Sequence, residues 1–335
     1  MRLSTCLSLA DVGSRIYFDR AGIIARARPH PFQKDRFTHV TEQQHRSGFV
    51  AIVGRANVGK STLMNALIGQ KLSIVSPKPH TTRHKLLGVL NGDDFQVALL
   101  DTPGFLRNGR DQLDAAMSRQ MVSALADADL ALLVVEPRMP GDVETKLMGQ
   151  LAQAKTPTIL VMNKIDTVAK MKLLPIMQHY YEALPFLEIV PVSGLDGEGL
   201  DTLLEQIVGH LPEQEAIFPP DMLTDRSMRF VASEIIREKV FLLYEQEIPY
   251  DVAVEVDEYA EREGTQPDLV RATIYVDKPS QKQLLIGKGG QALKEVGTQA
   301  REEIVEIVER PVFVELWVKV NPKWRRKAGF IQRTL

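Results

Sequence analysis

The chain has 335 residues, of which 44% are hydrophobic and 25% charged, so it is long enough to form two domains with separate cores. Its formal net charge of −2 gives no global sign of nucleic-acid binding, and its only cysteine, Cys6, excludes an internal disulfide. No apolar run is as long as a membrane span. The single cysteine fits a reducing compartment, so a cytoplasmic location is the expectation.

Residues 1–47 differ in character from the rest of the chain. They contain many arginines, few carboxylates and no sustained hydrophobic period. Organelle transit peptides have such a composition, but Asp11, Asp19 and Asp35 speak against that alternative. We interpret the segment as an extension that is either disordered or an artefact of an upstream start codon.

Residues 48–214 alternate short apolar runs with helical stretches. This rhythm predicts an α/β domain with a mostly parallel sheet and helices on both faces. The expected strands are residues 49–53, 86–90, 96–100, 130–135, 158–162 and 188–192. Such folds bind ligands at the carboxyl edge of the sheet, so the loops after these strands are the candidates for a site.

The first of these loops fits the phosphate-binding pattern G-x-x-x-x-G-K-[ST] between an apolar strand and a helix. Its backbone N–H groups and the helix N-terminus are expected to hold phosphate oxygens. Lys60 is expected to reach the β- and γ-phosphates and Ser61 to bind Mg²⁺. A simple glycine turn is the alternative, which the full pattern disfavours. The loop consists of Gly54, Arg55, Ala56, Asn57, Val58, Gly59, Lys60 and Ser61.

The loop after residues 96–100 is Asp101-Thr102-Pro103-Gly104. A carboxylate at a strand end can hold the metal, usually through water, and the Gly104 N–H can reach the γ-phosphate. By itself this sequence is a common turn. Downstream of a phosphate-binding loop and at a strand end, it predicts part of the same site.

Two later loops predict the base. Asp166, in Asn163-Lys164-Ile165-Asp166, can accept hydrogen bonds from guanine N1–H and N2–H₂, a donor pair that adenine lacks. The Asn163 amide can bind N7, and the Lys164 stem can lie over the base. Ser193-Gly194 supplies the last loop, near O6. We therefore predict GTP and GDP as ligands.

Residues 77–84 are polar and turn-prone and lie between the first two loops. A segment held by the γ-phosphate and Mg²⁺ orders with GTP and relaxes after hydrolysis. Thr81 and Thr82 are both candidates for the threonine that reaches the metal, and the residues alone do not separate them. An ordinary surface loop is the alternative.

Phe105 follows Gly104, where Ras-like proteins have a glutamine that orients the attacking water. A phenylalanine side chain offers no hydrogen bond to water, so intrinsic hydrolysis should be slow. The side-chain oxygen of Asn57 is a candidate to hold a monovalent cation beside the phosphates, which would supply charge stabilisation. Alternatively, Asn57 only caps the loop.

After a proline-bearing linker at residues 215–226, the pattern changes at residue 227. Helix, strand, strand, helix, helix and strand follow, which predicts a small α+β domain over residues 227–335. Its two central helices are joined by Gly287-Lys288-Gly289-Gly290, a GXXG loop of the kind with which KH domains bind nucleic-acid backbone. Such a loop also suits a plain helix turn.

The second domain carries the local evidence for RNA binding. Glycines allow close backbone approach, lysines add charge, and a tryptophan in the basic tail can stack on a base. A solvated C-terminus is the alternative for the tail. The predicted RNA-binding residues are Ile286, Gly287, Lys288, Gly289, Gly290, Lys294 and Trp324.

From Gly48 onward the chain resembles the bacterial Era GTPase family. The similarity is carried by residues 54–61, 81–84, 101–104 and 163–166, and in the second domain by Thr224 to Ser227, the GXXG loop and residues 316–320. The run Ala-Ser-Glu-Ile-Ile-Arg-Glu-Lys at 232–239 is the most specific part, because no general physical requirement demands that string.

This resemblance implies a GTP-hydrolysing factor in assembly of the 30S ribosomal subunit. Its type II KH domain would bind the 3′ end of 16S rRNA, and the protein would act as a monomer in the cytoplasm, with peripheral attachment to the inner face of the cell membrane. It also implies Mg²⁺ bound by Ser61, Thr81 and Asp101, and K⁺ bound near Asn57. Our own hypothesis for the coupling is that GTP orders residues 77–84 and 101–120, and that these segments then bias how the second domain is held.

Three features depart from the family pattern. Ala56 replaces a usual proline, the tail after Trp324 lacks the usual acidic residues, and residues 1–47 have no counterpart. The alternative function is a related translation or tRNA-modification GTPase whose second domain binds a protein. A metabolic kinase is a third class, against which Asn163 and Asp166 argue.

Overall fold

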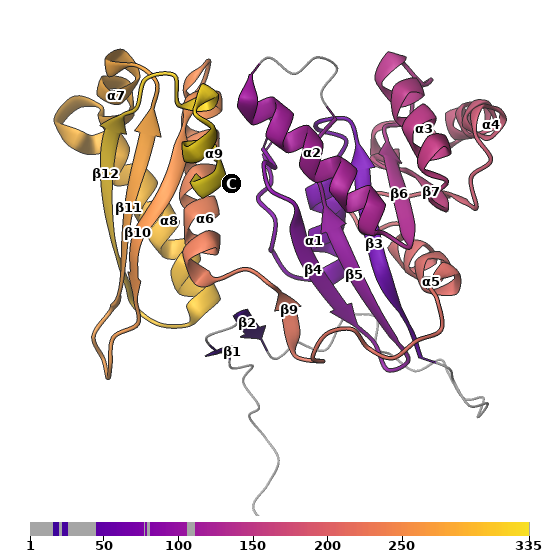
Figure 1. The fold of residues 1–335 in the computed structure, drawn as a ribbon, viewed down its shortest axis with the longest axis horizontal. Coiled ribbons are helices and arrows are strands. Elements are labelled where there is room, and N and C mark those ends of the chain that lie inside the picture. The colour runs from indigo at the N-terminus through magenta and orange to yellow at the C-terminus, as the bar shows by residue number, and fades with distance from the viewer. Residues whose placement is uncertain are drawn as a thin grey trace, which may run out of the picture.

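The computed structural model describes residues 16–19, 22–25, 45–76, 78, 81–105 and 111–334. Figure 1 shows two domains side by side, connected by the segment that contains β9 (Met222–Thr224). Two short strands precede them, β1 (Ile16–Asp19) and β2 (Gly22–Ala25), and β2 pairs antiparallel with β9. Most of residues 1–47 lie outside the described part, so our interpretation of that segment stays a prediction.

The first domain contains a six-stranded sheet in the order β4-β5-β3-β6-β7-β8. Only the β4–β5 pair is antiparallel, which confirms the predicted mostly parallel α/β class. The bounds lie within three residues of the predicted ones. The strands are β3 (Arg46–Gly54), β4 (Leu86–Asn91), β5 (Phe95–Asp101), β6 (Leu130–Val135), β7 (Thr158–Met162) and β8 (Ile189–Pro191).

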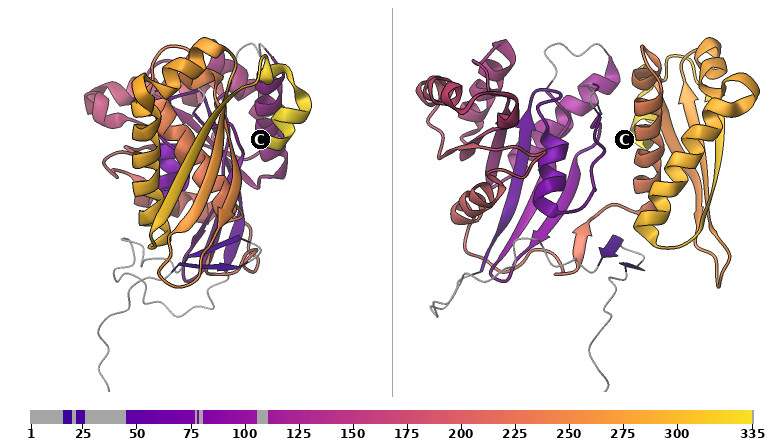
Figure 2. Two further views of the ribbon diagram at one scale, coloured as in Figure 1. Left: turned by 90° about the vertical axis from the view of Figure 1, so that its left-hand side faces the viewer. Right: turned by 180° about the vertical axis from the view of Figure 1, so that it is seen from behind.

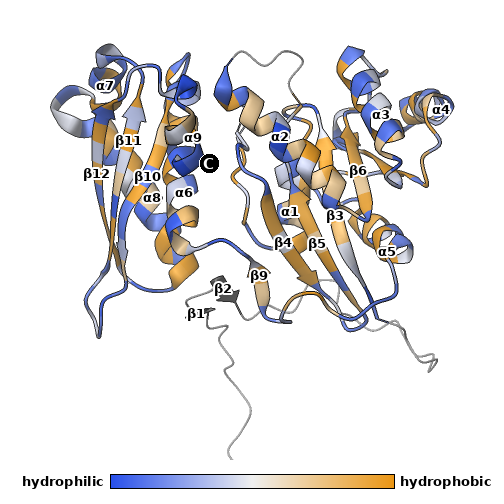
Figure 3. Cartoon of the chain, viewed as in Figure 1, coloured by the Kyte–Doolittle hydropathy of each residue, from blue (hydrophilic) through white to orange (hydrophobic). Residues whose placement is uncertain are grey.

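Helices cover both faces of this sheet. Successive strand residues alternate between two apolar clusters, so the strands read as nearly continuous hydrophobic runs, whereas the helices show a hydrophilic and a hydrophobic side (Figure 3). One cluster includes α1 (Lys60–Ile68) and α5 (Leu200–His210). The other includes α2 (Gln112–Asp127), α3 (Asp142–Ala154) and α4 (Leu173–Ala183).

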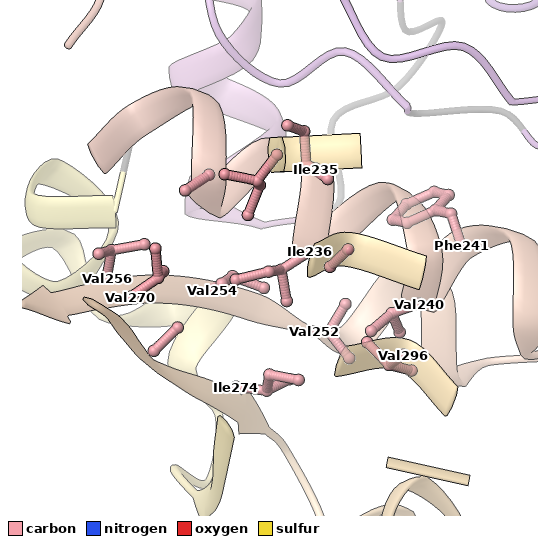
Figure 4. Packing of buried hydrophobic residues seen from close by; sticks show 14 of the residues in the cluster. Ile235, Ile236, Val240, Phe241, Val252, Val254, Val256, Val270, Ile274 and Val296 are labelled. Atoms are coloured by element: carbon pink, nitrogen blue, oxygen red, sulfur yellow. The ribbon is translucent and has the colours of Figure 1, made fainter. Parts of the chain in front are cut away.

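The second domain has the predicted order of elements. A three-stranded sheet, β10-β11-β12, carries the three predicted helices on one face, whereas the C-terminal helix packs on the other face with Ala253 and Tyr275. Strand β11 pairs antiparallel with β10 and parallel with β12. In its core Ile236 lies beside Val254, and Val240 lies beside Val252 and Val296 (Figure 4). The elements are α6 (Met228–Leu243), β10 (Ala253–Ala260), β11 (Asp268–Val276), α7 (Pro279–Ile286), α8 (Gln291–Val308) and β12 (Val312–Val320).

The two domains contact each other through α6 and the C-terminal segment. The views in Figures 1 and 2 place α6 and α9 (Ala328–Thr334) on the side of the second domain that faces α2. Short 3₁₀ helices complete the chain at Ile165–Thr167, Lys170–Lys172, Ile248–Asp251, Lys288–Gly290 and Trp324–Arg326. Among the helices of the described residues, none combines the length and apolar character needed to cross a membrane.

Candidate functional site

The loop between β3 and α1 requires glycine at two positions. Gly59 has φ 93°, and a Cβ there would lie 2.4 Å from Asn163 Nδ2. A Cβ on Gly54 would lie 2.4 Å from the Val134 carbonyl oxygen. The loop therefore passes close to two neighbouring segments of the sheet edge, and its backbone can curl around a phosphate without side chains in the way.

Lys60 begins α1 and lies under this loop. Its side chain is buried, and Nζ donates a hydrogen bond to the Arg55 carbonyl oxygen at 3.1 Å. Burial lowers the pKa of Lys60, an effect that the charge of Asp101 partly offsets. Together with Ala56, Asn57 and Gly104, Lys60 lines one hollow of the surface.

The predicted metal ligands Ser61 and Asp101 lie together. Ser61 Oγ donates to Asp101 Oδ2 at 2.6 Å, and Ser73 Oγ donates to the same oxygen at 2.8 Å. Burial raises the pKa of Asp101 despite the nearby Lys60 charge. Asp101 Oδ1 is buried and has no hydrogen-bond partner among the described residues. An unpaired buried carboxylate oxygen beside a serine hydroxyl fits a hard cation such as Mg²⁺.

The structure places the two candidate threonines differently, and Thr82 rather than Thr81 lies beside the predicted ligand Ser61. Thr82 Oγ1 lies 2.8 Å from Ser61 Oγ, within the group that contains Asp101. Thr81 Oγ1 instead donates to the Lys78 carbonyl oxygen at 2.7 Å. The reason is that Thr81 and Thr82 point in different directions from an extended segment, so only one of them faces Ser61. Residues 77, 79 and 80 of the predicted segment lie outside the described part.

The predicted base-binding residues converge at the carboxyl ends of β7 and β8. Asn163 donates to the Val58 carbonyl oxygen at 2.9 Å and accepts from the Gly194 N–H at 2.9 Å, so it joins the phosphate loop to the last loop. Ser193 Oγ donates to Asp166 Oδ1 at 2.8 Å, which orients the exposed carboxylate. Lys164 Nζ donates to the Asn57 carbonyl oxygen at 2.6 Å.

The turn after β5 lies against the phosphate loop. Thr102 Oγ1 donates to the Ile52 carbonyl oxygen at 2.7 Å, and the Phe105 N–H donates to the Gly54 carbonyl oxygen at 3.1 Å. A Cβ on Gly104 would lie 2.8 Å from Ala56 Cα. Gly104 is therefore required for this close approach, and Pro103 occupies the bend between Thr102 and Gly104.

In the second domain, the GXXG loop joins α7 to α8. All three glycines have positive φ: 72° at Gly287, 60° at Gly289 and 78° at Gly290. Lys288 and Lys294 are exposed, whereas Ile286 is partly buried against the core. The loop backbone and the two lysines are thus available to a phosphate backbone.

Trp324 was predicted to stack on RNA, and the structure shows this prediction to be wrong. The side chain is only 1% exposed and packs with Leu113 and Met117 of α2 and with Phe330 of α9. Its Nε1 donates to the Asp251 carbonyl oxygen at 2.8 Å. The sequence shows an aromatic residue in a basic tail, but it does not show that the tail folds back onto the first domain.

Ser73 is a residue of the site that sequence reasoning missed. It belongs to no motif and has a position only because Asn65 of α1 accepts hydrogen bonds from the Leu72 and Ser73 N–H groups, at 3.0 and 2.9 Å. In the sequence, Ser73 could have been suspected only because it is a polar residue early in the loop that leads from α1 to Thr81 and Thr82.

Comparisons with known proteins agree with this geometry. The 50S ribosome-binding GTPase family model matches residues 49–164, and the KH domain model matches residues 247–325. GTPase Era of Ruminiclostridium cellulolyticum is 41% identical, with 86% of this chain and 96% of that protein covered. GTPase Era of Geotalea daltonii is 44% identical, with 85% and 96% covered.

Two solved structures are similar over the whole fold. A variant of Aquifex aeolicus Era bound to GDP and AlF₄⁻ has a TM-score of 0.84 and 39% identity, covering 86% of this chain and 98% of that one. Era in complex with MgGDPNP and nucleotides 1506–1542 of 16S ribosomal RNA has the same TM-score and identity and covers 87% and 98%. With a guanine-nucleotide site, a KH domain and relatives of this similarity over nearly their full length, the chain belongs to the Era GTPase family.

Proposed function

We propose that this chain is a GTP-hydrolysing switch that binds 16S rRNA near its 3′ end through its second domain and acts in assembly of the 30S ribosomal subunit. The observation that carries this proposal is the presence of both sites in one chain. The full-length similarity to an Era complex that contains MgGDPNP and 16S rRNA nucleotides supports it.

Different residues of the first domain bind different parts of the nucleotide. Loop N–H groups and Lys60 bind the phosphates, Gly104 offers its N–H to the γ-phosphate, and Asp166 accepts from guanine. Mg²⁺ would be held by Ser61 and Thr82, with Asp101 beside them, and when bound it supplies positive charge against the phosphate oxygens. The short Ser61–Asp101 and Ser61–Thr82 contacts support this ligand group.

Thr82→Ala is expected to raise the Mg²⁺ concentration needed for tight binding of a GTP analogue by about tenfold, because a ligand to the metal is lost. Thr81→Ala is the matched control, since its hydroxyl donates to a main-chain carbonyl instead. A fluorescent GTP analogue titrated with Mg²⁺ measures both. A larger increase in the required Mg²⁺ concentration for Thr81→Ala than for Thr82→Ala would instead identify Thr81 as the metal ligand.

Hydrolysis is proposed to be slow and assisted by K⁺ near Asn57. Phe105 offers no side-chain group to orient water, and Asn57 is exposed at the top of the phosphate loop with φ 66°. We expect GTP turnover to fall at least several-fold when Na⁺ replaces K⁺, because a smaller cation fits the same oxygen ligands poorly. Asn57→Ala should abolish that difference. Equal rates in both salts contradict the cation role.

RNA recovered with the protein from cells tests the second half of the proposal. Crosslinked fragments should map to the 3′ end of 16S rRNA, and the double change Lys288→Glu and Lys294→Glu should remove them, because two exposed positive charges next to the GXXG loop become negative. Lys172→Glu and Lys155→Glu in the first domain form the control. Recovery of a protein partner without rRNA favours the alternative GTPase class.

We also infer that the protein acts in the cytoplasm as a monomer, with part of it attached peripherally to the inner face of the cell membrane. Family membership supports this inference. Fractionation of cells followed by sedimentation of the protein in each fraction tests both the location and the oligomeric state.

A further inference from the structure

Helix α6 carries three charged side chains that are buried. Arg237 is 2% exposed, Glu238 1% and Lys239 9%. Buried charges lower stability unless they are paired and hydrogen-bonded, so each needs a charged or polar partner. These residues belong to the run at 232–239, which general rules of helix formation do not explain.

Lys239 pairs with Glu303 of its own domain, but Glu238 has partners in the first domain, in the segment between α1 and β4. Glu238 accepts from Lys71 Nζ at 2.6 Å and from the Val75 N–H at 2.9 Å. Lys78 Nζ donates to the carbonyl oxygens of Phe241 and Tyr244, at the C-terminal end of α6, where helix carbonyls lack partners within the helix. The charged face of α6 is therefore complementary to this segment.

Arg237 contacts the first domain next to Thr82, one of the proposed Mg²⁺ ligands. One of its nitrogens, Nη2, donates to the Thr81 carbonyl oxygen at 2.6 Å, and its guanidinium also binds both carboxylate oxygens of Glu234, at 2.7 and 2.5 Å. Burial would raise the pKa of Glu234, but the charges of Arg237 and His84 outweigh it and hold that pKa at about 2. Glu234 thus stays ionised and fixes the direction of Arg237.

The residue on the other side of Thr82 is also held by the second domain. Arg83 donates to the carbonyl oxygens of Val252 at 2.5 Å and Tyr250 at 3.0 Å. Thr82 consequently lies between two residues anchored to the second domain, while its own hydroxyl is 2.8 Å from Ser61. The main chain on both sides of Thr82 is thus hydrogen-bonded or anchored to the second domain.

We propose that Arg237 of the second domain is a positioning residue for the nucleotide site of the first, because it holds Thr82 toward Ser61 and Asp101. The inference rests on the proposed role of Thr82 in Mg²⁺ binding. It makes α6 part of the machinery that recognises the GTP state. By linkage, any ligand that displaces α6 changes the Mg²⁺ requirement of the GTP-bound protein.

The test is an Mg²⁺ titration of the full chain with a fluorescent, non-hydrolysable GTP analogue and, in parallel, with fluorescent GDP. Arg237→Lys keeps the positive charge beside Glu234. The lysine ammonium, however, lacks the planar guanidinium that donates to the Glu234 carboxylate and to the Thr81 carbonyl oxygen at the same time. We expect the Arg237→Lys variant to need an about tenfold higher Mg²⁺ concentration for half-maximal binding of the GTP analogue. This is the usual effect of losing one hydrogen bond that involves a charged group. GDP binding should change less than about twofold, because this segment is released in the GDP state.

Arg229→Lys is the matched control. Arg229 is on the same helix and donates to the carbonyl oxygens of Val256 and Asp257 within its own domain, so both titrations should stay at the wild-type values. Unchanged Mg²⁺ dependence in Arg237→Lys, or equal weakening of GDP and the GTP analogue, overturns the proposal. If Thr82→Ala also has no effect, the assignment of Thr82 itself fails; if it has its effect, only the role of Arg237 fails.

Discussion

Asp166→Asn is expected to lower the affinity for GTP by about 10²–10⁴-fold, the loss of two hydrogen bonds to a charged acceptor. The same variant should bind xanthosine triphosphate, because xanthine presents O2 as an acceptor to the amide of asparagine. Ser193 Oγ holds the carboxylate of Asp166 in place at 2.8 Å, so the exchanged amide should occupy the same position. Competition of GTP and xanthosine triphosphate for a fluorescent nucleotide measures the change.

Asp196→Asn is the control for this exchange. Asp196 lies in the loop after β8 and its N–H donates to Ser193 Oγ, so the variant removes a negative charge nearby without removing the predicted acceptor. Its preference should remain with GTP. A preference for guanine that persists in Asp166→Asn would show that other groups read the base.

Trp324→Ala is expected to lower the free energy of unfolding by about 3–5 kcal/mol, the usual cost of removing a large aromatic side chain from a packed core. Trp324 fills the contact between α2, β10 and α9, and its ring lies 5.8 Å from that of Phe330. Without it, the C-terminal segment loses its main apolar contact with α2, although Arg325 still binds Asp111 and Asp114. Urea unfolding followed by circular dichroism measures the loss.

Trp317→Ala provides a matched comparison within the same domain. Trp317 is 57% exposed on β12, so its removal should lower stability by less than about 1 kcal/mol. Stacking on RNA would instead make Trp324→Ala weaken RNA binding by about 1–3 kcal/mol with little change in stability. That pair of results would contradict the buried position of Trp324.

Much of the nucleotide site was predictable because its motifs are local. A glycine loop between a strand and a helix has a required spacing, and loops after parallel strands share one edge of the sheet. Gly59, Asp101, Asn163 and Asp166 could therefore be expected at one edge of the sheet from their neighbours in the chain, and the structure brings them together there. The GXXG loop between two helices and the element order of the second domain were predictable for the same reason, since each depends on residues close in sequence.

Contacts between the two domains were decided only by the tertiary structure. The Thr81 carbonyl oxygen accepts a hydrogen bond from Arg237, which is 156 residues away from Thr81, and the burial of Trp324 depends on α2 of the first domain. Hydrophobic period and local spacing determine which elements form, but they contain no information about which faces of two finished domains meet. The charges of α6 are an example: Arg237 pairs with Glu234 on the same helix, but its contact with Thr81 and the contact of Glu238 with Lys71 form only when the two domains pack together.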